Sequence, residues 1–504
     1  MENKFRKNFF QNASVAFVLQ IVNLFSSFVV RTVFVKQLGN EYLSLNGLFV
    51  NVVSLLSFAE LGIGNAIIFS LYEPVVANNN EKINSLMNVF KKAYRGIRIT
   101  IIVLGLSITP FINLSVKDIS INEDFKLLFL LFLANTYVSY FYAYKKSLLI
   151  ADQKNYIVAL AQQIVLIIQS IFQCFVLVIW HNYLLYLVLQ MIGTMLTNLL
   201  TSSYVDRHYV YLRDDAPPLT KREVYNIFDN IKNIFCYKVG AVILNSTDNI
   251  LISALITTKL VGLYSNYSMI ISALNGVLMQ VCNSIAATIG NYNVVNNDDK
   301  NESTFRSIFF VSFWVFGVCT ICLAELLNPF VCLWLGDNYL LSFSTIVIIS
   351  LVFYVTGINQ IPSQYRTSFG IFKQAKLVPI IAAFLNIILS IFFGKKIGLN
   401  GIFIATIVAK VFTFNIVDPY LIYKNGFNKK YDRFMIVKVQ YFIVLVISFS
   451  VVHFLNTFIN IDGVYGFLYK SSLTFLLANF LFAILLIRHY EFRKALRGLK
   501  HGKD

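Results

Sequence analysis

Apolar runs of about 20 residues recur from one end of this chain to the other, and they constrain its fold more than any other feature. A helix of that length spans the hydrocarbon core of a membrane. Of the 504 residues, 57% are hydrophobic and 13% are charged, a balance typical of polytopic membrane proteins. A transmembrane barrel would instead show alternating segments of about ten residues. The sequence therefore predicts an all-α polytopic membrane protein.

Hydropathy predicts about 14 membrane-spanning helices. The basic start of the chain, MENKFRKNFF, leads into the first span without a small-residue cleavage site, so we expect an uncleaved first helix. The expected spans are 13–36, 42–71, 95–116, 125–149, 156–180, 183–203, 232–256, 260–290, 306–328, 339–360, 376–394, 399–423, 435–456 and 466–488.

The distribution of basic residues predicts the topology. With the N-terminus inside, about 32 of the 42 Lys and Arg residues, Lys145 and Lys146 among them, fall in cytoplasmic segments, as the positive-inside rule requires. Both termini are therefore expected in the cytoplasm. The net charge of +17 is spread over short loops between spans, which indicates attraction to anionic lipids and excludes nucleic acid as a partner.

The spans divide into two halves that resemble a repeat. We expect a six-helix lobe over 1–203, a cytoplasmic linker over 204–231, a second six-helix lobe over 232–425, and two extra helices with a basic tail over 426–504. An offset of about 219 residues superposes the segments after Leu38 and Leu260, and six spans per half give both halves the same orientation. In the linker, Thr220 and Glu223 form a capping-box pattern that predicts a short amphipathic helix.

The first span carries a polar stripe. Gln20, Asn23, Ser27 and Arg31 are spaced by three, four and four residues, which places them on one helical face. An Arg at the centre of a bilayer costs at least about 2.5 to 3.5 kcal/mol, so such residues usually face a bundle interior or a water-filled cavity.

The equivalent helix of the second half carries a matching stripe of Lys238, Asn245, Asp248 and Asn249. The offset places Asp248 two residues from the position equivalent to Arg31. The sequence predicts a central, partly cationic cavity lined by both stripes. An Arg31–Asp248 ion pair that closes an outer gate is the alternative.

Polar residues in other spans also indicate a water-filled interior. We assign Lys410 to the cavity as well, because a cation in a membrane needs water or a partner. For the Gln and Thr residues, hydrogen bonding between helices is an equal alternative. These stripes are Gln162, Gln169 and Gln173; Gln190, Thr194, Thr197 and Thr201; and Thr406, Lys410 and Thr413.

No cofactor, metal or catalytic site is expected. Cys319 and Cys322 lie within an apolar run without a second pair, so they are better explained as small membrane-helix residues. The sequence has no GxxxxGK[ST] motif for ATP. Asp248, Glu60 and Glu325 are the acidic candidates for gating or for coupling to H⁺ or Na⁺, although Glu60 could equally be a helix-end charge.

Two short segments resemble a known family. Phe58-Ala59-Glu60-Leu61-Gly62-Ile63-Gly64-Asn65-Ala66 is similar to an element in the second helix of polysaccharide flippases, the translocases of O-antigen, capsule and exopolysaccharide repeat units. Gly262-Leu263-Tyr264-Ser265-Asn266-Tyr267 is similar to the matching element of the second half. This family lies within the larger group that also holds multidrug extruders and lipid II flippases.

The resemblance implies a function. It predicts that an undecaprenyl-diphosphate-linked oligosaccharide is turned from the cytoplasmic to the outer leaflet of a bacterial inner membrane by alternating access of two lobes. The polysaccharide polymerase machinery is an expected partner. An ion-coupled multidrug antiporter is the alternative, although it would more often carry an acid where Arg31 stands. A membrane polymerase or ligase is less expected, because the outer loops are short.

Overall fold

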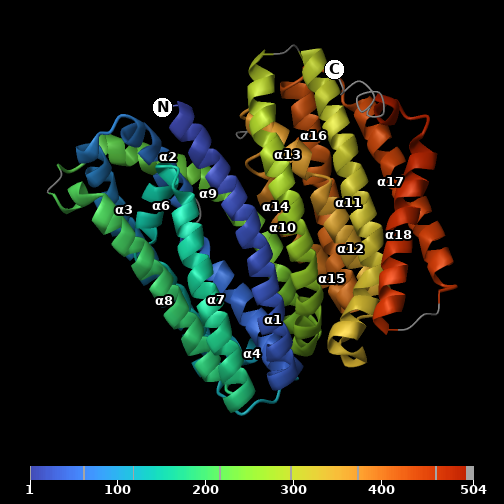
Figure 1. The fold of residues 1–504 in the computed structure, drawn as a ribbon, viewed down its shortest axis with the longest axis horizontal. Coiled ribbons are helices and arrows are strands. Elements are labelled where there is room, and N and C mark those ends of the chain that lie inside the picture. Colours follow the sequence, from blue (N-terminus) through green and yellow to red (C-terminus); the bar gives the residue numbers. More distant parts are fainter. Residues whose placement is uncertain are drawn as a thin grey trace. The chain divides into compact units, whose positions relative to one another are not determined.

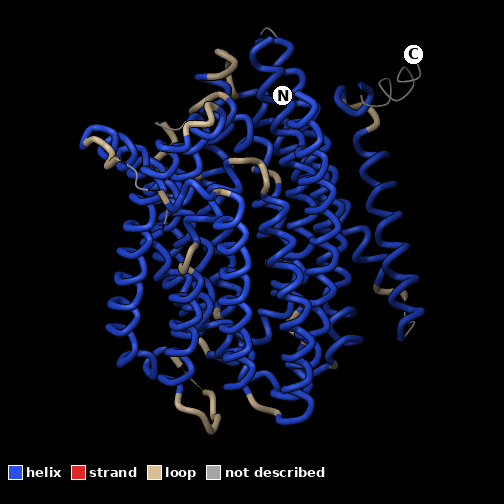
Figure 2. The backbone as a smooth tube through the Cα atoms, turned by 60° about the vertical axis from the view of Figure 1, so that its left-hand side comes forward, coloured by secondary structure: helices blue, strands red, loops and turns tan. Residues whose placement is uncertain are grey.

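The computed structural model describes residues 2–60, 63–116, 118–214, 217–295, 298–371, 374–459 and 463–494. Over these residues the chain is helical, and no strand is found (Figures 1 and 2). The chain divides into two compact units, residues 1–262 and residues 263–504.

The first unit contains nine helices of the described chain and the start of a tenth. They are α1 (Glu2–Leu56), α2 (Ile63–Val76), α3 (Asn80–Ile108), α4 (Ile112–Ser115), α5 (Phe125–Ser139), α6 (Ala143–Ala151), α7 (Asn155–Trp180), α8 (Tyr183–His208), α9 (Lys221–Leu255) and the beginning of α10 (Thr258–Val295).

The second unit continues α10 and holds the remaining helices. They are α11 (Asp298–Leu335), α12 (Phe343–Gly357), α13 (Gln360–Ser368), α14 (Val378–Ile397), α15 (Leu399–Phe412), α16 (Phe414–Asn425), α17 (Asp432–Asn456) and α18 (Gly463–Leu486).

Ten helices of the described chain are long and apolar enough to cross a membrane, or eleven if the pair α5 and α6, bent by 43°, forms one span. Helix α1 is two helices that meet at Gly39, where φ is +80° and the helical path is interrupted. Helices α9 and α10 fall at two further predicted spans, and neither is among the ten. The count of about 14 spans therefore stays a prediction.

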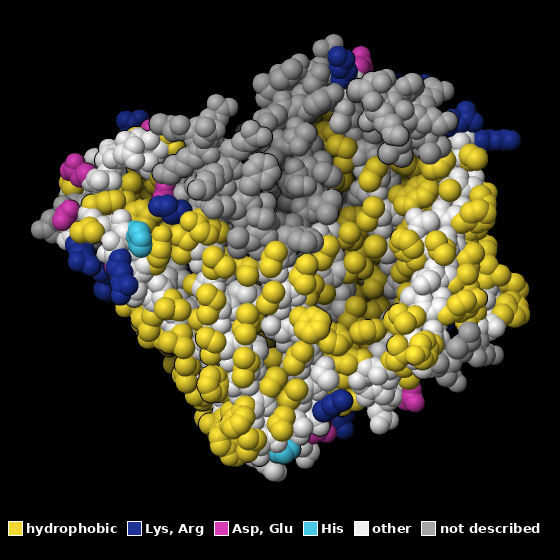
Figure 3. All heavy atoms as spheres, viewed as in Figure 1, with side chains coloured by type: hydrophobic (Ala, Val, Ile, Leu, Met, Phe, Trp, Pro, Cys, Tyr) yellow, Lys and Arg dark blue, Asp and Glu magenta, His cyan; other side chains and the backbone are white. Residues whose placement is uncertain are grey.

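The outer surface of the helices suits lipid. On the face drawn in Figure 3, hydrophobic side chains cover the middle of the helices, and Lys and Arg gather toward their ends. A helix surrounded by hydrocarbon needs apolar side chains outside and must satisfy its backbone internally. Large apolar side chains with more than half of their surface exposed include Ile164, Ile171, Phe175, Trp180, Phe454, Leu476 and Phe480.

Helix α9 differs from its prediction. Thr220 and Glu223 form the expected capping box: the Thr220 amide donates to Glu223 Oε2 over 2.9 Å, and the Glu223 amide donates to Thr220 Oγ1 over 3.3 Å. The helix that this box starts is not short, however, because α9 continues without interruption for 35 residues. Helix α9 also packs against α1 and α2 inside the first unit. The lobes 1–203 and 232–425, defined by the repeat rather than by contacts, stay a prediction.

The two segments that the predicted repeat makes equivalent, in α1 and at the start of α10, touch each other. Asn40 Nδ2 donates to the Lys259 carbonyl over 3.0 Å, and these residues are 219 positions apart, close to the offset of the predicted repeat. The Gly262 amide donates to Ser44 Oγ over 3.1 Å. A Cβ on Gly262 would lie 2.2 Å from Ser44 Oγ and 2.8 Å from the Asn40 carbonyl oxygen, so this approach requires glycine.

In the second unit, α17 and α18 pack on α11 through aromatic rings. The Phe313 ring stacks on Tyr441 with centroids 4.4 Å apart, and on Phe482 with centroids 5.2 Å apart. Trp314 Nε1 donates to Asn479 Oδ1 over 2.9 Å. Stacked pairs of this kind add about 0.5 to 1.5 kcal/mol each beyond the burial of their area. The two C-terminal helices are therefore an integral part of this unit.

Candidate functional site

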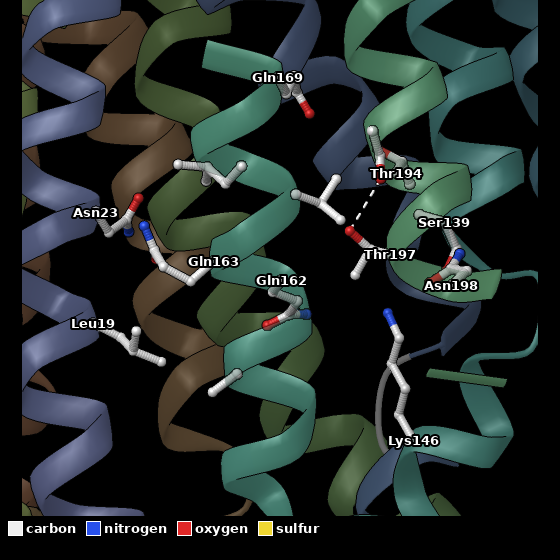
Figure 4. A pocket seen from close by; sticks show the side chains of 14 residues that line it. Leu19, Asn23, Ser139, Lys146, Gln162, Gln163, Gln169, Thr194, Thr197 and Asn198 are labelled. Carbon is white, nitrogen blue, oxygen red and sulfur yellow. Dashed lines mark hydrogen bonds between the residues drawn. The ribbon is translucent and has the colours of Figure 1, made fainter. Parts of the chain in front are cut away.

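The first unit has an open cavity of about 520 Å³ between α1, α5, α6, α7 and α8. Its lining combines amide, hydroxyl and ammonium groups with a few aliphatic side chains, as Figure 4 shows. The lining residues are Leu19, Asn23, Ser139, Lys146, Ala159, Gln162, Gln163, Val165, Leu166, Gln169, Gly193, Thr194, Thr197 and Asn198.

The helix break before α6 brings Lys146 to this cavity. Tyr142 adopts a left-handed conformation with φ +59°, which bends α6 away from α5. Figure 4 shows the Lys146 ammonium pointing into the space beneath Thr197 and Asn198. A residue that hydropathy assigns to the cytoplasmic end of a span is thereby directed into the interior of the unit.

Lys146 differs from the lysines around it. Lys145 Nζ lies 2.6 Å from Asp206 Oδ2, and Lys154 Nζ lies 2.6 Å from Asp152 Oδ2. In the described part of the chain, Lys146 has no such ion pair and no hydrogen bond; its electrostatic partner is Glu60. An ammonium that lines a cavity without a bonded carboxylate attracts an anion.

The walls from α7 and α8 are rich in hydrogen-bonding groups. Thr194 Oγ1 donates to Asn135 Oδ1 over 2.8 Å, and Asn198 Nδ2 donates to the Val138 carbonyl over 2.9 Å, so these two side chains are held in place. Gln163 Nε2 is buried without a hydrogen-bond partner among the described residues. Gly193 leaves room for the Gln169 amide, which lies 2.0 Å from where a Cβ would stand. The cavity can replace water around a polar molecule.

The predicted stripes meet this cavity in part. Asn23 of α1 lines it, together with Gln162, Gln169, Thr194 and Thr197. Gln173 instead donates to the Tyr186 carbonyl over 3.2 Å, which joins α7 to α8. Some residues of these stripes therefore line the cavity, and others form hydrogen bonds between helices.

Arg31 and Lys410 are not among the residues that line this cavity. Ser27 Oγ donates to Asn23 Oδ1 over 3.4 Å, and half-buried Arg31 lies near Tyr186. Lys410 of α15 is in the second unit, where its ammonium donates to Thr356 Oγ1 over 2.8 Å. The side chains of Gln20, Lys238 and Asn245 lie outside the described residues.

The acidic candidates have structural partners. Glu60 accepts a hydrogen bond from the Tyr94 hydroxyl over 3.3 Å. Glu325 Oε1 lies 2.8 Å from His453 Nδ1, and Glu325 Oε2 accepts from Asn456 Nδ2 over 3.0 Å. Asp248 lies on α9 and is partly exposed. Its pairing with Arg31 stays a prediction.

No group of three or more side chains suited to hold a metal occurs in the described chain. Lys146 is the functional candidate that the sequence did not reveal, because it was counted among the cytoplasmic charges. The sequence signal that could have identified Lys146 was its position opposite the polar faces of α7 and α8.

Comparison with solved structures defines the class of the fold. A lipid II flippase MurJ in an inward closed conformation matches with a TM-score of 0.67 at 18% identity, over 94% of this chain and 98% of that chain. An inward-facing multidrug resistance MATE transporter of the MOP superfamily matches with a TM-score of 0.62 at 15% identity, over 80% and 96%. A mutant of the Vibrio cholerae MATE transporter VcmN has a TM-score of 0.57 at 13% identity, over 84% and 98%. These matches show that this chain has the multi-pass helical fold of those membrane proteins.

Residues 9–289 match the family described as Polysaccharide biosynthesis protein, and this chain belongs to that family. No curated protein matches the sequence. The predicted all-α polytopic fold and the predicted family are thereby confirmed. The predicted function is confirmed at the level of the family, which is polysaccharide biosynthesis.

Proposed function

We propose that this protein turns a saccharide linked through a diphosphate to undecaprenol from the cytoplasmic to the outer leaflet, for assembly of a surface polysaccharide. The observation that carries this proposal is the cavity of the first unit, where Lys146 lies among amide and hydroxyl groups and forms no ion pair with any described residue. An ammonium suits a phosphate, and amides and hydroxyls suit a sugar. The name of the matched lipid II flippase supports a lipid-linked cargo.

The rival function is export of organic cations, as the matched multidrug transporters suggest. A carboxylate in the binding site attracts a cationic drug, whereas a lysine repels it. The described lining of the cavity includes a Lys and no Asp or Glu. Repulsion between like charges therefore favours the anionic cargo.

We also propose a second, central cavity between two lobes, which would open to each side of the membrane in turn. Arg31 and Lys238 would neutralise the diphosphate there, with Asn23, Ser27, Gln20, Asn245 and Lys410 as further polar groups. We propose further that transport is coupled to H⁺ or Na⁺, and that the protein contacts a polysaccharide polymerase and anionic lipids. Its location would be a bacterial inner membrane, with both termini in the cytoplasm. A cysteine in 204–231 that resists an impermeant thiol reagent in intact cells would support this orientation.

The test replaces the charge at the cavity. A charged hydrogen bond contributes about 1.5 to 3 kcal/mol, so Lys146→Gln should weaken cargo binding by about 10- to 150-fold. Cells that carry it should accumulate the lipid-linked saccharide inside and lose surface polysaccharide. Lys146→Arg should keep export, and Lys154→Gln, which alters a paired lysine outside the cavity, is the matched control. Normal export by Lys146→Gln at normal protein level would refute the assignment, and Arg31→Ala tests the central cavity in the same way.

A further inference from the structure

The end of α16 and the start of α17 form an open pocket of about 580 Å³ in the second unit. These helices belong to two of the candidate membrane spans, Leu399–Asn425 and Asp432–Asn456, and the pocket lies where the first span ends and the second begins. The ends of membrane-spanning helices lie at the depth of the lipid headgroups. The pocket shares no residue with the cavity around Lys146.

Two lysines of this pocket form no ion pair with a described residue. Lys424 Nζ lies over the Tyr420 ring, 5.6 Å from its centroid, and Lys430 has no hydrogen bond within the described chain either. Lys429 differs, because its ammonium lies 2.6 Å from Glu302 Oε2. An anion that enters the pocket therefore meets two ammonium groups that no bonded carboxylate offsets.

The polar groups beside these lysines suit a headgroup that carries hydroxyls. Asp432 and Asn428 bring a carboxylate and an amide to the same pocket. Two unpaired ammonium groups and one carboxylate leave a charge of plus one, which complements a headgroup with a single negative charge. A carboxylate accepts hydrogen bonds from hydroxyl groups. The lining therefore suits a phosphate diester with free hydroxyls.

The surface around the pocket suits a lipid. The Tyr420 and Tyr431 rings line the pocket with their centroids 6.1 Å apart, and tyrosines gather at the interface between membrane and water. Asp432, Ile436 and Val439 are spaced by four and three residues, so they share one face of α17, and the two apolar side chains are exposed. An acyl chain can lie on this apolar surface beside a headgroup held in the pocket.

We propose that this pocket is a binding site for an acidic phospholipid with a hydroxylated headgroup, the chemistry of phosphatidylglycerol. Lys424 and Lys430 neutralise the phosphate, and Asp432 accepts a hydrogen bond from the headgroup hydroxyls. The inference rests on the contact with anionic lipids in the proposed function and gives that contact one site. It does not depend on the cargo, so its failure would leave the proposed export untouched.

The test titrates lipids into the purified full-length protein in detergent and follows the midpoint of thermal unfolding. The midpoint should rise with phosphatidylglycerol and saturate, because a ligand of the folded state stabilises it. Phosphatidylmethanol has the same charge without the hydroxyls and should bind more weakly. Sodium phosphate, compared with sodium chloride of equal ionic strength, should not raise the midpoint. An equal rise with sodium phosphate would overturn the assignment to a lipid.

Two double variants isolate the pocket from general attraction between charges. Lys424→Gln combined with Lys430→Gln should weaken phosphatidylglycerol binding by about 30-fold, since a lysine near an anionic lipid contributes about fivefold. Lys395→Gln combined with Lys396→Gln is the matched control. It removes two exposed lysines at the end of α14, where Lys396 Nζ also lies over an aromatic ring, 4.5 Å from the Phe392 centroid. Its affinity should equal that of the wild type, and an equal loss in both double variants would refute a specific site.

Asp432→Ala tests recognition of the hydroxyls. This variant should bind phosphatidylglycerol and phosphatidylmethanol equally well, because the acceptor is gone and the lysines remain. If the wild type already bound the two lipids equally, or if Asp432→Ala kept the preference for phosphatidylglycerol, the role assigned to the carboxylate would be wrong.

Discussion

Glu325 is the acidic candidate for which the structure makes the sharpest prediction. Its carboxylate is 4% exposed and joins α11 to α17 through His453 and Asn456, with a nitrogen 2.8 Å or 3.0 Å from each oxygen. Asn456 also donates to Thr474 of α18 over 3.0 Å. One carboxylate therefore holds both C-terminal helices on the rest of the unit, which suggests a structural role in place of coupling.

The magnitude follows from these two hydrogen bonds. Glu325→Gln keeps the shape and loses the charge, and a hydrogen bond to a charged group exceeds a neutral one by about 1 kcal/mol. The variant should therefore lose about 2 kcal/mol of unfolding free energy, or about 30-fold in the equilibrium constant. Glu325→Ala loses both bonds and should lose about 3 kcal/mol or more, since such bonds contribute about 1.5 to 3 kcal/mol each.

The assay is denaturant unfolding in detergent micelles, followed by tryptophan fluorescence. Trp314 is a suitable reporter because it bonds to Asn479 of α18. Asp299→Asn, whose side chain is 86% exposed, is the matched control and should change stability by less than about 1 kcal/mol. A structural role also requires that Glu325→Gln still exports polysaccharide at low temperature. If Glu325→Gln were as stable as the wild type and inactive, the carboxylate would be a coupling group.

Two further predictions concern the first unit. Gly262→Ala should lower the free energy of unfolding by about 1 to 3 kcal/mol, because the new Cβ would overlap Ser44 Oγ. Gly96→Ala is the control and should not lower it, because no atom lies within 4 Å of its Cβ position. Thermal unfolding compares the two variants. The Lys82 ammonium and the hydrogen bonds of the Thr220 cap lower the pKa of Glu223 from 4.5 to about 2. The Glu223 carboxylate therefore stabilises the start of α9 fully above pH 4.5, and this stabilisation is lost as the pH falls toward 2. Hydrogen exchange at the start of α9 should show this loss, and Glu223→Gln should show no such dependence on pH.

The helices were predictable where one physical signal dominates. The predicted spans 156–180 and 183–203 match α7 and α8 closely, because their surfaces are apolar and Asn182 caps α8 through the Leu185 amide over 2.9 Å. The capping box at Thr220 was predicted for the same reason, since capping depends on neighbouring residues alone. The length of α9 was not, because its continuation past 231 depends on packing against α1 and α2.

The candidate site was predictable only in part. Hydropathy and charge placed Lys146 with Lys145 at a cytoplasmic end, since both rules average over a window and give no direction to a side chain. The left-handed turn at Tyr142 and the pairing of Lys145 with Asp206 separate the two lysines. Both features depend on tertiary contacts. Polar stripes on α7 and α8 indicated that a wet interior exists, but not which cation enters it.

The walls of the cavity come from a single unit, and this has a consequence for direction. If the two units move as rigid bodies, the groups around Lys146 stay the same whether the cavity opens to one leaflet or the other. A cargo bound with equal affinity in both states cannot shift the balance between them. Such a cavity transports its cargo equally well in both directions. Net transport must then be driven by consumption of the cargo on the far side, or by energy coupled to another part of the chain.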